Sequence, residues 1–146
     1  MDRTVTTLVP TESEFNNEDY LDAPELQSLA TQLIEKYPGL FNWIPSLRLT
    51  YLWKRKASKY RGRIVAGQVQ KTPKLMRHFV TTEWVIWIAA DQFIGADVTD
   101  IGIEQTLFHE LLHLIENPKT GKATLRAHDH EYFTAEAEQY PGTCGV

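Results

Sequence analysis

The chain has 146 residues, of which 42% are hydrophobic and 23% charged, so it can bury the core of one domain and is not a disordered chain. It carries a net charge of −4 and one cysteine, Cys144, which excludes an intrachain disulfide and favours a reducing compartment. The longest apolar run, residues 84–90, is too short to cross a bilayer, and residues 1–20 lack the pattern of a secretory signal. We therefore expect a cytoplasmic protein with no membrane contact.

The charges are unevenly distributed along the chain. Residues 1–53 hold three basic residues (Lys or Arg) and eight acidic residues (Asp or Glu). Residues 54–77 hold nine basic residues and no acidic residue, and residues 78–146 hold three basic and eleven acidic residues. The basic segment 54–77 has two interpretations. Its cations either shield a sheet edge as a solvated hairpin, which is the more common use, or contact a polyanion such as DNA. The candidate nucleic-acid contacts are Lys54, Arg55, Lys56, Lys59, Arg61 and Arg63.

The first half of the chain predicts one helix followed by two strands. Residues 1–20 are polar and acidic and predict a flexible leader before a single domain at 21–146. A helix is expected to begin after an N-cap at Asp22 and to end at Tyr37, because proline and glycine follow. Alternating apolar residues then predict a half-buried strand at 46–53, a turn at 54–62, and a second strand at 63–70 that is weakened by its glycine.

The second half predicts a buried strand and two helices. Residues 81–89 are apolar on both faces, which is typical of a strand inside a sheet. The strongest helix is expected at 101–116 with Thr99 or Asp100 as N-cap, and a last helix is expected at 129–140. The predicted class is α+β, with a small, mostly antiparallel sheet of about three strands packed against helices.

The strongest chemical signal is the H-E-x-x-H motif from His109 through Glu110 to His113, inside the strongest predicted helix. Residues four apart lie one turn apart on the same helix face, so both imidazoles can reach one metal ion. The intervening glutamate can then accept a proton from water instead of binding the metal. The motif therefore predicts a catalytic metal site.

A zinc site of this kind needs a third protein ligand, and four candidates follow the motif. The residues are His128, Asp129, His130 and Glu131. His128 stands fifteen residues after His113, which is enough chain to leave the helix, turn and return to the metal. Spacing alone leaves His130 and Glu131 as rivals.

The run from Phe108 to His113, a glycine-bearing loop, and then His128-Asp129 with Phe133 resembles the putative phage metallopeptidase family. These are small zincin-like proteins similar in layout to SprT-like proteases. The similarity extends upstream through residues 60–63 and 84–87, so it covers about 25–140. The resemblance implies a minimal zincin-like fold and a phage or prophage origin. It also implies His109, His113 and His128 as ligands and Glu110 as the general base.

The motif and the resemblance together predict a zinc-dependent endopeptidase that holds one Zn²⁺ and acts on a host or phage protein. Asp129 either orients a ligand histidine or caps the last helix. Tyr132 either donates to the developing oxyanion or belongs to the core. By resemblance to other zincins, the strand before the active-site helix is expected to pair with an extended substrate.

Three alternatives to a simple phage peptidase stay open at this stage. A DNA-associated SprT-like protease would use the basic segment 54–77 as its nucleic-acid contact. A phage effector that cleaves or binds a host protein would show the same motif. A non-catalytic, zinc-stabilised binding module would need the ligands for folding but would not need Glu110.

Overall fold

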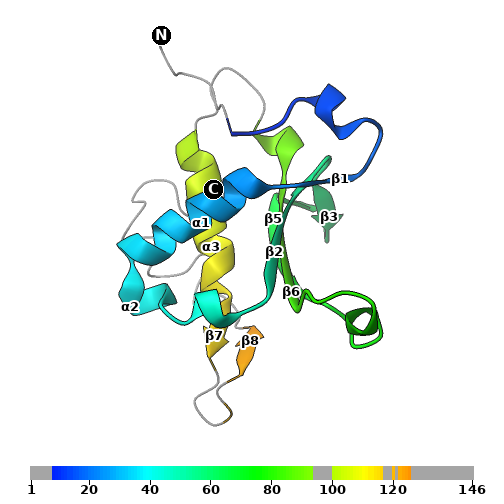
Figure 1. Cartoon of the computed structure of the whole chain (residues 1–146). Helices are drawn as coiled ribbons and strands as arrows, with labels where there is room; N and C mark the ends of the chain where they lie inside the picture. The colour runs from blue at the N-terminus through cyan, green and yellow to red at the C-terminus, as the bar shows by residue number, and fades with distance from the viewer. Residues whose placement is uncertain (1–7, 94–99, 117–119, 121, 126–146) are drawn as a thin grey trace.

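The computed structural model describes residues 8–93, 100–116, 120 and 122–125, and its largest feature is a four-stranded sheet (Figure 1). The strand order is β1 (Tyr20–Asp22), β2 (Leu49–Lys54), β6 (Trp84–Ala89) and β5 (Gly67–Lys71). The β2–β6 pair is parallel, and the β1–β2 and β5–β6 pairs are antiparallel. The strands β2 and β6 are therefore internal, and β1 and β5 form the two edges.

Helices cover one side of this sheet, and two hairpins lie outside it (Figure 1). The helices are α1 (Pro24–Lys36), α2 (Pro38–Phe41) and α3 (Asp100–Leu112). The hairpins join β3 (Ser58–Tyr60) to β4 (Arg63–Val65) and β7 (Leu114–Glu116) to β8 (Ala123–Leu125). Short 3₁₀ turns complete the described elements: η1 (Glu12–Phe15), η2 (Ile44–Ser46), η3 (Met76–His78) and η4 (Ala90–Gln92). The predicted α+β class with a small, mostly antiparallel sheet is confirmed.

The core lies between the sheet and the helices. Five of the six side chains of β6 are buried, which confirms the prediction of a strand inside the sheet. The helix α1 buries Leu26, Ala30 and Leu33, which follow one another at helical spacing. Its end at Lys36 agrees with the prediction, because the residue before a proline disfavours helical backbone. The N-cap is Ala23, and not Asp22 as the sequence suggested, because Asp22 is the last residue of β1.

Residues 8–20 differ from the expected flexible leader, and residues 1–7 of that leader lie outside the described residues. From Leu8 onward this segment packs on the domain, and Phe15 is only 1% exposed within the core. The turn η1 is stabilised locally because the Thr11 N–H donates a hydrogen bond of 2.6 Å to the Glu14 carboxylate. Residues 20–22 then add the strand β1 to the sheet. One buried aromatic ring and one strand pairing are enough to order a segment whose composition is mostly polar.

Two element boundaries also differ from the prediction. The helix expected at 101–116 ends at Leu112, because residues 114–116 pair with β8 instead of continuing the helix. The expected turn at 54–62 contains the strand β3, and the expected strand at 63–70 is divided into β4 and β5. The last predicted helix, 129–140, lies outside the described residues. Within the described part of the chain, no helix combines the length and the apolarity needed to span a bilayer.

Candidate metal centre

The helix α3 is fixed against the rest of the core on two sides. On one side, the buried ring of Phe108 makes edge-to-face contacts with Tyr37 and Phe41, with ring centroids 5.3 and 5.4 Å apart. On the other side, α3 lies against β5 and β6 of the sheet, and its Leu107 and Leu111 are also fully buried. This packing determines which way the polar residues at the C-terminal end of α3 are presented.

A glycine allows α3 to lie directly on the edge strand. A Cβ atom built at Gly67 in β5 would stand 3.1 Å from Cγ2 of Thr106 and 3.4 Å from Cγ of Glu110. The sequence suggested that Gly67 only weakens a strand. In the structure, its missing side chain provides the space in which α3, and Glu110 with it, approaches the sheet.

The H-E-x-x-H residues come together at the end of α3. The imidazole rings of His109 and His113 have centroids 5.2 Å apart and planes inclined by 72°. One ligating atom from each of His109, Glu110 and His113 lies within 4.8 Å of the other two. Both imidazoles are half-buried, whereas Glu110 is 6% exposed and is the one buried charged side chain in the described part of the chain.

The second histidine stands where the helix gives way to a strand. The His113 N–H donates to the carbonyl of Glu110 at 3.1 Å, which closes α3 with a tightened last turn. The strand β7 begins at the next residue, and Leu114 lies opposite Leu125 in the β7–β8 pair. The hairpin therefore brings the chain back beside the motif just before the residues that contain the third-ligand candidates.

This donor set fits a divalent metal ion such as zinc. Zinc–imidazole bonds are about 2.0–2.1 Å long, so two nitrogens that share one tetrahedral ion lie about 3.3 Å apart. The ligand atoms of the motif lie within 4.8 Å of one another, so the imidazoles would have to move closer together to bind one ion. A buried carboxylate is costly unless cations or hydrogen-bond donors compensate it, and a bound cation would contribute to that compensation.

The other predicted site residues divide into two groups. His128, Asp129, His130, Glu131 and Tyr132 lie outside the described residues, so the third ligand and the proposed roles of Asp129 and Tyr132 stay predictions. The six basic candidates are all described, and they lie at the end of β2 and on the β3–β4 hairpin.

The six basic candidates differ in their contacts and in their exposure. Lys54 bonds to the Ser58 hydroxyl and lies over the Trp87 ring, 4.6 Å from its centroid. Arg55 forms an ion pair with Glu12. The other four, Lys56, Lys59, Arg61 and Arg63, are exposed.

The strand expected to pair with substrate is not available for pairing. That strand is β6, and it hydrogen-bonds to β2 on one side and to β5 on the other. The strand beside α3 with an edge not paired by any described strand is β5. The sequence predicted a strand here but did not indicate that β5 lies beside α3, although a glycine within a strand is a known sign that another backbone or a ligand approaches closely.

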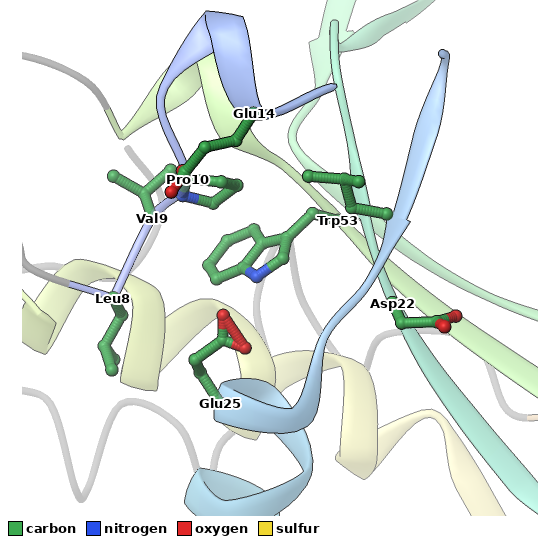
Figure 2. A pocket seen from close by; sticks show the side chains of 8 residues that line it. Leu8, Val9, Pro10, Glu14, Asp22, Glu25 and Trp53 are labelled. Carbon is green, nitrogen blue, oxygen red and sulfur yellow. The ribbon is translucent and has the colours of Figure 1, made fainter. Parts of the chain in front are cut away.

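A separate cavity of about 280 Å³ lies on the N-terminal side of the molecule (Figure 2). Its lining includes Pro10, Glu25 and Trp53, and it contains no residue of the H-E-x-x-H motif. The indole nitrogen of Trp53 and one carboxylate oxygen of Glu25 are buried there without a hydrogen-bond partner in the described part of the chain. A cavity of this size has room for water, which can satisfy both atoms. It is not a candidate for the metal centre because none of the motif residues lines it.

Comparison with known proteins agrees with the geometry at the end of α3. A family model described as putative phage metallopeptidase matches residues 18–142. No curated protein and no solved structure gives a significant match. The match includes the sheet, α3 and the whole region of the third-ligand candidates. The chain belongs to the putative phage metallopeptidase family.

Proposed function

We propose that this protein is a zinc-dependent endopeptidase that cleaves a host or phage protein. The observation that carries the proposal is the convergence of two half-buried imidazoles and one buried carboxylate within 4.8 Å at the end of α3. A structural zinc site needs ligands only. A buried glutamate between two ligand histidines is the additional element that hydrolysis requires.

His109 and His113 would hold the ion, and His128 is the proposed third ligand. Leu125 pairs with Leu114, the residue after His113, and three further residues of chain span at most about 11 Å. This length of chain would allow His128 to reach the two histidines. When bound, zinc would polarise the scissile carbonyl and lower the pKa of its water ligand to about 7.

Glu110 is the proposed general base. Its carboxylate would take the proton of the attacking water and then deliver it to the nitrogen of the departing amine. Burial supports this role because a carboxylate with little bulk water around it is held in one place beside the histidines. Gly67 contributes by leaving room for the side chain of Glu110 next to β5. In this scheme Asp129 would orient a ligand histidine and Tyr132 would donate to the oxyanion.

The edge strand β5 is the proposed docking element for an extended peptide. It lies directly against α3 through Gly67, and exposed glutamines at 68 and 70 alternate with the buried Val69. An added strand would form main-chain hydrogen bonds with β5, and its scissile bond would lie near the end of α3. Such binding selects an unfolded or extended segment, which is typical of an endopeptidase substrate.

The test is metal-dependent cleavage. The full chain, purified without a histidine tag, is incubated with denatured host-cell proteins, and new peptide termini are counted by mass spectrometry. We expect cleavage that stops on chelation and returns on addition of zinc, together with one zinc per chain. His109→Ala and His113→Ala should both lose zinc and activity, whereas His78→Ala, at an exposed position in η3, should keep both. Zinc binding without any cleavage would favour the non-catalytic binding module.

A further inference from the structure

The β3–β4 hairpin is a feature that the proposed peptidase chemistry does not use. It forms a two-stranded sheet of its own and lies on the side of the main sheet opposite α1 and α3 (Figure 1). Tyr60 pairs with Arg63, so Arg61 and Gly62 form a two-residue turn. Both turn residues have positive φ angles, 51° and 77°. Turns of this kind match the twist of the strands they join, so the hairpin has a defined shape.

The base of the hairpin is held by contacts with the rest of the domain. The Ala57 N–H donates to the carboxylate of Asp91 at 3.0 Å. On the other strand, the Ala66 carbonyl accepts a hydrogen bond of 2.8 Å from the N–H of Ala89. Arg55, just before the hairpin, is engaged by Glu12. Asp91 thus contacts the base of the hairpin and Glu12 the residue just before it, and the tip projects from a fixed support.

The tip carries cations that no described carboxylate neutralises. Lys59, Arg61 and Arg63 are exposed, as is Lys56 at the base, and none has an ion pair with another described residue. The guanidinium of Arg61 lies over the ring of Tyr60, 5.2 Å from its centroid, and that ring is 63% exposed. Because Tyr60 pairs with Arg63, these two side chains share one face of the hairpin. Lys59 pairs with the exposed Ile64, and this pair occupies the other face.

We propose that the β3–β4 hairpin is a binding element for duplex DNA. A two-stranded ribbon fits the major groove, which is about 12 Å wide, and cations on both faces of the ribbon can reach phosphates on both walls. Shielding of the main sheet explains the charges less well, because the hairpin pairs with neither edge strand, β1 or β5.

The test is the salt dependence of binding to a fluorescent duplex of about 20 base pairs, measured by anisotropy on the full chain. Four phosphate contacts predict a slope of about −3.6 in log K against log salt, so affinity should fall about 10²-fold between 50 and 200 mM salt. The double variant Lys59→Gln/Arg61→Asn should reduce the slope by about 2. Asparagine suits the turn because it tolerates positive φ, so the hairpin should keep its shape.

A matched control removes two exposed cations elsewhere, as Lys36→Gln/Lys122→Gln, and has the same net charge as the hairpin variant. Its slope should equal that of the wild type. Four results would overturn the proposal: no binding at 50 mM salt, equal losses in the two double variants, tighter binding to the single strand than to the duplex, or equally tight binding to poly-glutamate. Glu110→Gln should bind the duplex as the wild type does, so this test is independent of the peptidase proposal.

Discussion

Replacing Gly67 by alanine tests whether close packing of α3 on β5 sets the geometry of the site. The new methyl group would stand 3.1 Å from Cγ2 of Thr106, whereas ordinary carbon contacts are 3.4 Å or longer. The helix must therefore move by about 0.3 Å or more, or the threonine must change rotamer. Overpacking of this kind costs about 1–3 kcal/mol, and the lower backbone entropy of unfolded alanine offsets about 0.4–1 kcal/mol of it.

We therefore expect Gly67→Ala to lower the free energy of unfolding by about 1–2 kcal/mol in urea titrations. It should also lower cleavage activity, because a shift of α3 that relieves the contact at Thr106 also moves Glu110, which lies one turn further along the same helix. Thr106→Ser removes the crowded methyl and keeps the hydroxyl that donates to the Gly102 carbonyl at 2.9 Å. The double variant Gly67→Ala/Thr106→Ser should recover most of the lost stability.

The control is Gly39→Ala in α2, where an added Cβ would meet no atom within 4 Å. It should leave stability unchanged or slightly raise it. The reasoning would be refuted by a Gly67→Ala protein as stable as the wild type, or by a loss that Thr106→Ser does not restore.

Three further predictions follow from the same structure. His128→Ala should lower zinc affinity far more than His130→Ala does. The effect of His130→Ala should not exceed 10–100-fold, which is typical of a residue that only orients a ligand. Equal losses of affinity in a chelator competition would mean that another residue completes the site. Phe108→Ala removes a fully buried ring that contacts two aromatic neighbours, so the unfolding free energy should fall by about 3–5 kcal/mol in urea, and a loss below 1 kcal/mol would contradict the packing described for α3. Burial raises the pKa of the Tyr51 phenol well above its ordinary value of about 10, so the unfolded chain loses this proton first as pH rises. Stability should therefore be complete below about pH 10 and fall above it by up to about 1.4 kcal/mol per pH unit, and Tyr51→Phe should reduce that slope, whereas an unchanged slope would show that the phenol is not the cause.

The features that the sequence predicted correctly are those determined by local pattern. The helix α1 ends where Pro38 forbids its continuation, and the buried strand β6 follows from a run of apolar residues. The motif residues His109, Glu110 and His113 could be placed on one helical turn because their spacing alone fixes their relation.

The features that the sequence did not predict depend on contacts between residues that are far apart in the chain. Residues 114–116 have a helical pattern, but their pairing with β8 outweighs that local preference and ends α3 early. The strand β1 forms only because β2 offers an edge thirty residues later in the chain. The function of Gly67 is likewise not visible locally, because it depends on the approach of Thr106 from a helix much further along the chain.

The most direct test of the central claim is the Glu110→Gln variant, assayed for zinc content and peptide cleavage in the same preparation. The substitution keeps the size of the side chain and removes the basic carboxylate, while the histidines are untouched. We expect full zinc content and a cleavage rate reduced by about 10²–10⁴-fold. Glu35→Gln, at an exposed position of α1, should cleave as the wild type does. A Glu110→Gln protein that holds zinc and cleaves at the wild-type rate would contradict the assignment of Glu110 as the general base and of this centre as a peptidase site.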